Sequence, residues 1–344
     1  MRPLSALYDG ILEARARRYA SGRSPSVRLS RPVVSVGNLT VGGTGKTPFV
    51  LHLAERFLSE GRRPAILSRG YGRRSREVVV VSSGAGPLVG PDEGGDEPVL
   101  AAGRLPGAIV VVAPRRADAA RAAEEFAPDV FILDDGFQHL SVRRDIDLLL
   151  LDAADPFGGG KYPPLGRLRE PLSALGRADA IVFTRASAGR PSSDVLSLVA
   201  RENPHAPVFT ARILAGGLTG DSGEPALKPG RCLAICGIAR PASFLESLSA
   251  IGIEPADWLV FSDHHRYTDA DVRRIESSVH RAGGAPVVTT EKDAVKLAGR
   301  LSIPILTLRL VVELNEPAFY PWLETRLFVG DAETESSARG ETQP

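Results

Sequence analysis

The sequence predicts an α/β fold built on a doubly wound sheet of mostly parallel strands. Near-continuous apolar runs at 129–135, 145–151 and 179–184 are typical of parallel strands that are covered on both faces. Helix-like segments alternate with such runs, which indicates βαβ units. At 344 residues the chain can bury a large core and form two domains.

The elements of the first half follow in a regular order. Further strands are predicted at 33–37, 64–68, 78–82 and 108–113. Helical spacing is found at 48–61, 97–105 and 115–127. Each helix follows a strand or a glycine-rich loop, as crossover connections require.

A second group of elements begins near residue 208. The segment 208–220 is predicted to be an extended connector. Strands are then expected at 231–237, 257–263, 286–293 and 303–314, and helices at 241–252 and 270–283. We therefore predict an N-terminal amphipathic helix (1–25), a core domain (26–207), a smaller C-terminal α/β domain (208–329) whose last segment can pack back on the core, and a disordered tail (330–344).

Composition excludes several functional classes. The formal net charge of +1 argues against a nucleic-acid partner. Cys232 and Cys236 alternate within an apolar run, so we expect reduced, buried side chains and no zinc site. No segment reaches the ~18 apolar residues of a membrane span, and the signal-peptide pattern is absent.

The N-terminal segment carries an apolar stripe beside a cationic run. The stripe is formed by Leu4, Leu7, Tyr8, Ile11 and Leu12, and the arginines by Arg15, Arg17, Arg18 and Arg23. Such a helix can lie in a membrane interface with anionic headgroups. It can equally be an amphipathic helix that docks on the core.

The loop after the first strand has the pattern of a phosphate-binding P-loop. It spans Thr40, Val41, Gly42, Gly43, Thr44, Gly45, Lys46 and Thr47. Its backbone N–H groups and the helix N-terminus favour phosphate oxygens. Lys46 would reach the β- and γ-phosphates of ATP, and Thr47 would hold Mg²⁺. Thr40 stands where the usual pattern has glycine, so the motif is a variant. We expect a P-loop NTPase-like α/β/α sandwich with a second, smaller α/β domain joined by an extended linker.

Two adjacent acids, Asp134 and Asp135, end the apolar strand at 129–135. An acid at the tip of a strand beside the P-loop commonly holds Mg²⁺, and ligands bind at the carboxyl ends of parallel strands. The alternative is that one of the two caps the following turn. His139 could reach the same crevice.

Two further segments could supply acid–base chemistry. Asp96 follows a glycine-rich loop and precedes a helix, so it is either an N-cap or a carboxylate that accepts a proton from a substrate hydroxyl. His264 and His265 follow Asp263. On an extended strand adjacent side chains diverge, and no third ligand closes a zinc site, so a hydrogen-bonding or acid–base role fits better.

Arginines on loops are candidate anion contacts. Arg167 and Arg169 lie on a Gly- and Pro-bounded loop, and Arg69 and Tyr71 follow the second strand. Guanidinium groups bind phosphate and carboxylate well, although each could be a solvated surface charge. The segment 289–293 either contacts a nucleotide or caps a helix.

Taken together, these segments resemble the tetraacyldisaccharide 4′-kinases, the lipid A 4′-kinases. The matching stretches are VGNLTVGGTGKTP, LSRGYGR, GDEP, FILDDGFQH, GRLREP, CGIARP, DHHRY and TTEKDAVK, between residues 36 and 296. The resemblance implies ATP-dependent phosphorylation, with Mg²⁺, of the 4′-hydroxyl of a tetraacylated glucosamine disaccharide 1-phosphate. It also implies a peripheral enzyme at the cytoplasmic face of the inner membrane, and two domains joined by a two-stranded linker.

The resemblance assigns roles to individual residues. Asp96 matches the catalytic base and one of His264 and His265 its partner, with a slight preference for His264. Lys46 and Thr47 match phosphate and Mg²⁺ contacts, and Asp134 and Asp135 the acidic pair. Arg69, Tyr71, His139 and Arg167 match positions near the reacting phosphates or the lipid headgroup.

A competing class is the membrane-associated switch ATPase of the partitioning or metallochaperone type. Its loop has a signature lysine directly before the glycine pair, where this chain has Val41. A non-catalytic nucleotide-binding module would leave Asp96 and the histidines without a role.

Overall fold

The computed structural model describes residues 2–186, 191–220 and 223–328. Within these residues the strands form one 13-stranded sheet, in which β1 (Val33–Asn38) lies between β5 (Val130–Asp134) and β6 (Ile146–Asp152). The sheet order β4-β2-β5-β1-β6-β7 is parallel, as predicted. The chain passes from β1 to β2 and β4 on one side, returns at β5, and then continues through β6 and β7 on the other side. Such a change of direction places a ligand-binding crevice at the carboxyl ends of the strands near β1.

The remaining elements of this first part have the following bounds. The strands are β2 (Pro64–Ser68), β3 (Val79–Ser83), β4 (Ile109–Val112) and β7 (Ala180–Thr184). The helices are α2 (Lys46–Ser59), α3 (Pro91–Gly94), α4 (Asp96–Arg104), α5 (Arg116–Glu124) and α6 (Ser193–Glu202), with short 3₁₀ turns at Gly158–Gly160 and Leu172–Arg177. We call these elements the core unit.

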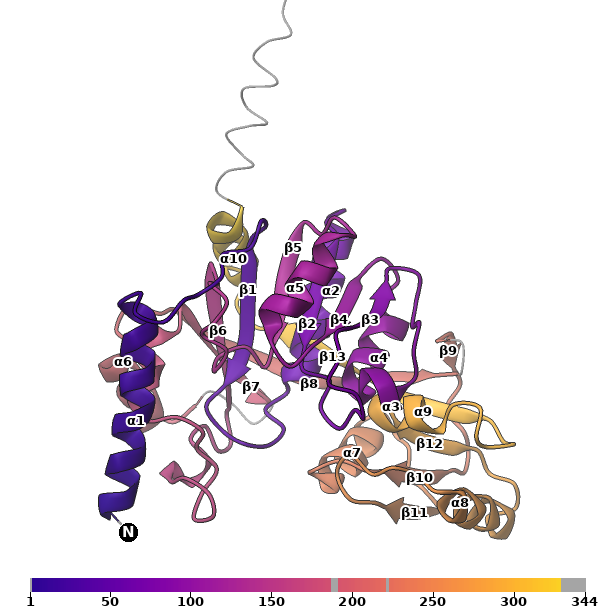
Figure 1. Ribbon diagram of the computed structural model, residues 1–344. Helices are drawn as coiled ribbons and strands as arrows, with labels where there is room; N and C mark the ends of the chain where they lie inside the picture. The colour runs from indigo at the N-terminus through magenta and orange to yellow at the C-terminus, as the bar shows by residue number, and fades with distance from the viewer. Residues whose placement is uncertain (1, 187–190, 221–222, 329–344) are drawn as a thin grey trace, which may run out of the picture.

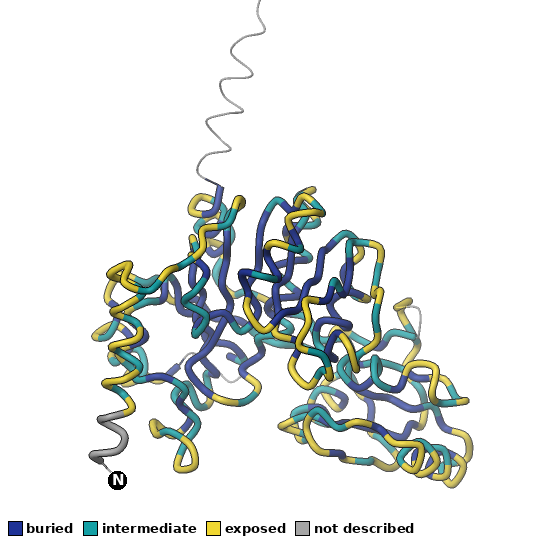
Figure 2. Tube along the Cα trace, viewed as in Figure 1, coloured by how far each residue is buried: buried dark blue, intermediate teal, exposed yellow. Residues whose placement is uncertain are grey.

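Alternating side chains build two apolar layers on the core unit. Val34 and Val36 of β1 pack under α2 and α4 on one face, whereas Val33 packs toward α5 on the other. This alternation follows from the two-residue period of a strand. Figure 2 shows the buried strands between helices that are exposed on their outer sides. The predicted α/β/α sandwich is therefore confirmed.

Two long strands connect the core unit to the rest of the chain. β8 (Val208–Thr219) pairs in parallel with β7 at its start and antiparallel with β13 (Ile305–Leu314) farther along. β13 in turn pairs with β12 of the next part. The predicted connector at 208–220 is thus a strand, and the sheet continues through it. Figure 1 shows the second group of elements beyond this two-stranded connection.

The second group forms a smaller three-layered unit. It contains β10 (Leu233–Cys236), β11 (Asp257–Val260), β12 (Val287–Thr290), α7 (Pro241–Ala250), α8 (Asp269–Arg281) and α9 (Glu291–Leu297), with a short β9 (Pro225–Ala226) on β8. Cys232 and Cys236 are free and buried toward α7. The other face of the sheet packs on α8 and α9. We call the elements from β9 to α9 the small unit. The domain boundaries at residues 208 and 329 stay a prediction.

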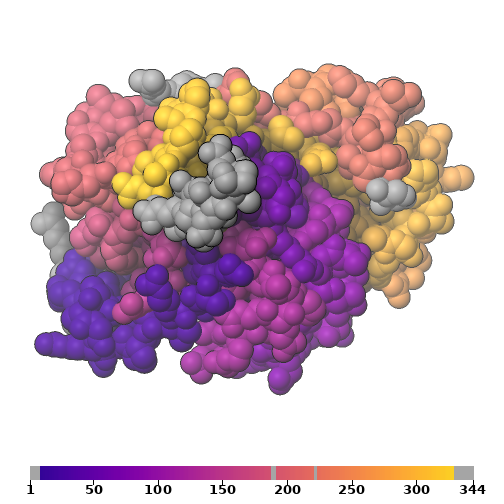
Figure 3. All heavy atoms as spheres, turned by 90° about the horizontal axis from the view of Figure 1, so that it is seen from above, coloured from indigo at the N-terminus to yellow at the C-terminus, as the bar shows by residue number. Residues whose placement is uncertain are grey.

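Both ends of the described chain lie on the core unit. α10 (Phe319–Leu327) buries Phe319 and Leu323 against it, and in Figure 3 the yellow helix lies beside core atoms, apart from the orange small unit. α1 (Arg2–Ala20) stands at the end of the core unit that faces away from the small unit (Figure 1). In the part of the chain that is described, no helix is long and apolar enough to cross a membrane. The predicted disordered tail (330–344) and the side chains of Leu4 and Leu7 lie outside the described residues.

Candidate active site

The P-loop lies between β1 and α2, as the sequence predicts. Gly42 and Gly45 have φ values of 111° and 81°, which favour glycine. A Cβ at Gly45 would lie 2.3 Å from Cδ1 of Ile213. The variant position Thr40 is buried but is not among the residues with positive φ. Its backbone therefore does not require glycine, which explains why the variant motif is tolerated.

The ends of β1 and β7 and the segment around Arg167 hold the loop in place. Asn38 Nδ2 donates hydrogen bonds to the carbonyl of Thr40 (2.7 Å) and to Thr44 Oγ1 (3.0 Å). Thr184, at the end of β7, donates to the carbonyl of Thr44 at 2.7 Å. The N–H of Val41 donates to the carbonyl of Arg167 at 2.6 Å. A loop that is fixed in this way presents preorganised N–H groups to an anion.

Lys46, at the start of α2, faces the second acid of the predicted pair. Its Nζ lies 3.4 Å from Asp135 Oδ1, and Arg169 Nη1 binds both oxygens of Asp135 at 2.8 and 3.0 Å. Burial alone would raise the pKa of Asp135, but these two cations outweigh it and lower the pKa to about 2. Asp135 is therefore ionised at neutral pH and orients the P-loop lysine.

Asp134 has a different environment at the end of β5. It is buried and accepts a hydrogen bond of 2.8 Å from Ser68 Oγ. Burial, followed by the charges of Glu97 and Asp135, raises the pKa of Asp134 to about 6. The buried guanidinium of Arg116 binds its backbone carbonyl at 2.9 Å. A carboxylate that burial destabilises in this way would be stabilised by a cation.

These residues fit the requirements of a P-loop Mg²⁺ site. No group of three or more His, Cys, Asp or Glu that could hold a metal occurs within the described residues. A P-loop site does not need such a group, because Mg²⁺ there binds one hydroxyl and one strand-end acid and otherwise phosphate and water. Thr47, in the first turn of α2, and Asp134 are of the required types.

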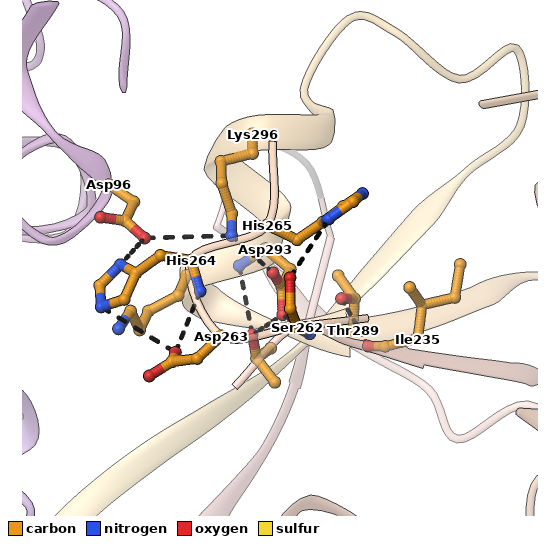
Figure 4. A network of polar contacts seen from close by, with 12 residues as sticks. Asp96, Ile235, Ser262, Asp263, His264, His265, Thr289, Asp293 and Lys296 are labelled. Carbon is orange, nitrogen blue, oxygen red and sulfur yellow. Dashed lines mark hydrogen bonds and ion pairs between the residues drawn. The ribbon is translucent and has the colours of Figure 1, made fainter. Parts of the chain in front are cut away.

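The structure brings Asp96 and His264 together from distant parts of the sequence. Asp96 begins α4, but the N-cap is Gly95, with φ 89°, and no side chain caps the helix. Instead, Nδ1 of His264 donates to Asp96 Oδ2 at 3.0 Å. Figure 4 shows this pair between the core unit and the small unit. The alternative interpretation of Asp96 as a helix cap is therefore wrong.

The charges of this pair depend on each other. Burial alone would raise the pKa of Asp96, but the hydrogen bond from His264 and the ammonium groups of Lys292 and Lys296 outweigh it, so the pKa is lowered. The hydrogen bond with Asp96 raises the pKa of His264. Tyr71 packs its ring on His264, with centroids 4.8 Å apart.

His265 makes different contacts. Its Nε2 lies 3.0 Å from Asp271 Oδ2, and its ring stacks on Phe261 at 4.8 Å between centroids. The reasoning that placed both histidines on an extended strand is wrong, because β11 ends at Val260 and His264 has φ 55° in a turn. The imidazoles diverge because the chain turns at His264. The structure thus pairs Asp96 with His264 and not with His265.

The other predicted contact residues have different surroundings. Arg69 is exposed and Tyr71 is 68% exposed. Arg167 Nη2 binds Asp155 Oδ2 at 2.6 Å, and a Cβ at Gly42 would lie 3.1 Å from Arg167 Nη1. Burial, with a contribution from Arg116, lowers the pKa of His139 to about 4, so its ring is neutral at neutral pH.

Sequence reasoning missed two lysines of the segment after β12 that lie near Asp96. The segment 289–293 caps a helix, because the N–H of Asp293 donates to Thr290 Oγ1 at 3.2 Å. Lys292 Nζ lies 2.9 Å from Glu97 Oε1, and Lys296 Nζ lies 3.9 Å from Asp96 Oδ2. The spacing of the two lysines, four residues apart, places them on one helix face. This spacing is the only local sequence pattern that could have indicated that the two lysines act together.

Two carboxylate environments therefore meet at the carboxyl ends of the core strands. One, around Lys46 and Asp135, can bind and neutralise phosphate oxygens. The other, Asp96 with His264, can accept a proton from a hydroxyl. A proton acceptor beside a phosphate-binding loop is the arrangement that phosphoryl transfer to an alcohol needs.

Comparisons with known proteins give one consistent family. The family model described as tetraacyldisaccharide-1-P 4′-kinase matches residues 1–328. A tetraacyldisaccharide 4′-kinase of Anaeromyxobacter sp. (strain K) is 45% identical over 298 residues, which cover 84% of this chain and 78% of the relative. The protein of the same name from Pelobacter propionicus is 43% identical over 326 residues, 92% of this chain and 88% of the relative.

A solved structure agrees with these matches. It is the "apo" form of LpxK from Aquifex aeolicus in complex with ATP, and it is 34% identical to this chain with a TM-score of 0.79. The match covers 95% of this chain and 98% of that chain.

Proposed function

The chain belongs to the tetraacyldisaccharide 4′-kinase family, and from this premise we propose that it transfers the γ-phosphoryl group of ATP to the 4′-hydroxyl of a tetraacylated glucosamine disaccharide 1-phosphate. The product is the 4′-phosphorylated lipid A precursor. The switch-ATPase alternative is not favoured, since the family model and the relatives reported above are kinases and Val41 replaces the signature lysine.

The proximity of Asp96 to the P-loop acids supports this proposal more than any other observation. A Cβ at Gly95 would lie 3.0 Å from Cα of Gly70, so the start of α4 packs on the loop that follows β2. Ser68, at the end of β2, binds Asp134. The candidate base therefore lies beside the acids that border the phosphate-binding loop, which is where an acceptor hydroxyl must enter.

In the proposed mechanism the core unit binds the nucleotide. The loop from Thr40 to Thr47 surrounds the phosphates, and Lys46 moves its ammonium group from Asp135 toward the β- and γ-phosphates. Arg169 keeps Asp135 ionised and in place. When bound, Mg²⁺ on Thr47 and Asp134 would neutralise charge on the phosphates. Positioning and electrostatics supply most of the rate in such a transfer.

Asp96 accepts the proton of the 4′-hydroxyl as its oxygen attacks the γ-phosphorus. A new O–P bond forms, the bond to the β-phosphate oxygen breaks, and ADP leaves. His264 donates to Asp96 Oδ2 and fixes the orientation of the carboxylate. Arg69, Tyr71, His139 and Arg167 are proposed to contact the phosphates or the lipid headgroup, with Tyr71 also supporting the His264 ring.

We further propose that the enzyme works at the cytoplasmic face of the inner membrane through α1. Tyr8 and Ile11 of this helix are 44% and 57% exposed, and its N-terminal end points to the same side as the carboxyl ends of the core strands (Figure 1). α1 contacts the core unit through a hydrogen bond between Tyr162 and Asp9 and one from Ser173 Oγ to Glu13 at 2.9 Å. Docking on the core and contact with lipid are therefore compatible.

The activity is tested with γ-labelled ATP and detergent-dispersed tetraacyl disaccharide 1-phosphate. We expect label in the lipid at the 4′-position, and little ADP formation when the acceptor is omitted. Asp96→Asn serves as the inactive control. Asp92→Asn is the matched control, because Asp92 is an exposed acid on neighbouring α3, and it should keep the activity of the wild type. Equal ATP hydrolysis with and without acceptor, and no labelled lipid, would contradict the proposal.

The membrane contact is tested by sedimentation with anionic liposomes. A variant that lacks residues 1–23 should move to the soluble fraction, more strongly at high salt, while it keeps activity on detergent-dispersed lipid. Full-length Ile11→Asp tests the apolar face without removal of the helix. Complete sedimentation of the truncated protein would place the anchor elsewhere.

A further inference from the structure

The carboxylate of Asp96 belongs to the core unit, but the charged groups that face it come from the small unit. His264 lies in the turn after β11, and Lys292 and Lys296 lie on α9. Asp263 lies 3.9 Å from Nε2 of His264, and Glu97 follows Asp96 on α4. The packing of α9 on α4 therefore determines the electrostatic environment of the candidate base.

Lys296 is a lysine whose Nζ lies 3.9 Å from Asp96 Oδ2, and it is anchored on its other side. Its side chain is 10% exposed, and its Nζ lies 2.8 Å from Asp293 Oδ1 in an ion pair that is not aligned as a hydrogen bond. The ammonium group also lies 5.4 Å from the centre of the Tyr267 ring. A buried ammonium group between two carboxylates is costly to desolvate, so its retention here calls for a reason.

Asp293 is a rigid anchor for this lysine. It is 0% exposed, and its Oδ2 accepts from the N–H of Gly237 at 2.8 Å and from Thr290 Oγ1 at 2.7 Å. These bonds leave Oδ1 for Lys296, and Figure 4 shows Lys296 extending from α9 toward Asp96. The side chain that approaches Asp96 is thus fixed from behind by the small-unit fold.

From this geometry we propose that Lys296, anchored by Asp293, is a positioning residue of the kinase that fixes the Asp96 carboxylate beside His264 and maintains its negative charge. This inference rests on the proposed role of Asp96 as the proton acceptor. The lowered pKa of Asp96, to which the ammonium groups of Lys292 and Lys296 contribute after its hydrogen bond with His264, agrees with it. The charge of Lys292 contributes more to this lowering than that of Lys296, but its ammonium group binds Glu97. Lys292→Met should therefore also move the acid limb, while it leaves the position of the Asp96 carboxylate and hence kcat closer to the wild type.

The test measures kcat and kcat/KM against pH for Lys296→Met, Lys296→Arg, Lys292→Met and the exposed control Lys228→Met, with ATP and the disaccharide lipid. For Lys296→Met we expect kcat at neutral pH to fall about 10- to 100-fold, since misplacement of a catalytic group by about 1 Å can cost on the order of 10²-fold. Because a cation near Asp96 and His264 is lost, the acid limb of the profile should move to higher pH. Lys296→Arg should keep the limb near its wild-type position.

Stability is separated from function in the same series. If Lys296→Met lowers the melting temperature, the double variant Lys296→Met with Asp293→Asn removes the uncompensated buried charge and should restore folding. It must still show the displaced acid limb. A purely structural salt bridge would change the folded fraction and leave the pH profile of the folded enzyme unchanged.

Several results would overturn the inference. A Lys296→Met profile that superimposes on that of the wild type, in an enzyme that Asp96→Asn inactivates, would exclude a positioning role. If Lys292→Met lowered kcat as much as Lys296→Met, the loss of activity would be due to the total charge of α9 and not to the position of Lys296. By contrast, a wild-type protein without lipid phosphorylation would contradict the proposed function itself.

Discussion

The two halves of the candidate site are built in different ways. The phosphate-binding half draws on the core unit alone, since Lys46, Asp135 and Arg169 all come from elements around β1 and β5. The proton-accepting half combines Asp96 of the core unit with His264 and Lys296 of the small unit. The first half is therefore fixed by one hydrophobic core, whereas the second exists only when two units are docked.

This difference has consequences for function. Nucleotide binding should tolerate changes in the small unit, because the P-loop is held by Asn38 and Thr184 of the core. Proton transfer should respond to any change that separates α9 or the His264 turn from α4. An enzyme built in this way has a complete base only with the two units together, which limits the exposure of bound ATP to a competent base and water.

The largest expected effect lies in the core-unit half. Lys46→Ala removes the cation expected at the β- and γ-phosphates, and we expect loss of detectable phosphate transfer with an unchanged melting temperature. Lys161→Ala, an exposed lysine, is the control. Activity near the wild-type level in folded Lys46→Ala would remove the P-loop from the mechanism.

The next effect lies at the boundary between the units. Asp96→Asn keeps the size of the side chain but cannot accept the proton, and a general base typically contributes ~10²- to 10⁴-fold. We expect kcat to fall by about this factor while ATP affinity, measured by titration calorimetry, changes little. A lower melting temperature with unchanged kcat per folded enzyme would instead give Asp96 a structural role.

The two adjacent histidines provide a matched pair of variants. His264→Ala removes the partner of Asp96 and should lower kcat about 10-fold or more, because the carboxylate loses its orientation. His265→Ala breaks the contact with Asp271 inside the small unit, so it should lower stability more than kcat. Steady-state kinetics and thermal melting of both variants check this, and equal kcat losses would contradict it.

A smaller effect is the pH dependence of stability. The pKa of Asp96 is lowered from 3.8 in the folded protein. Its contribution to the free energy of unfolding is therefore present above pH 3.8 and is lost as the pH falls through the pKa of the folded state. The pKa of His264 is raised from 6.5 in the folded protein. Its contribution to the free energy of unfolding is therefore complete below pH 6.5 and is lost as the pH rises through the pKa of the folded state. The destabilisation by His264→Ala, about 1.5–3 kcal/mol for a charged hydrogen bond, should therefore be largest between pH 3.8 and 6.5. Denaturant unfolding at acid, neutral and alkaline pH measures it, and a pH-independent difference would contradict the ion pair.

The same contrast explains what sequence could predict. The strand–loop–helix context of Lys46 and the acids at the end of β5 are local patterns, so the core-unit half could be predicted from the sequence. Asp96 and His264 are 168 positions apart, and from the residues alone only a choice between two histidines was possible. The turn at His264 and the burial of Asp293 arise from the packing of the small unit, which no short pattern encodes.

The central claim is that Asp96 and His264, which come from two different units, act together in proton transfer. A double-mutant cycle on kcat tests this claim most directly. The cycle uses Asp96→Asn, His264→Ala and the double variant in enzyme shown to be folded. Because residues that act as a unit are not additive, the double variant should be little worse than Asp96→Asn alone. Losses that multiply in the double variant would show that the two residues act independently and would contradict the account.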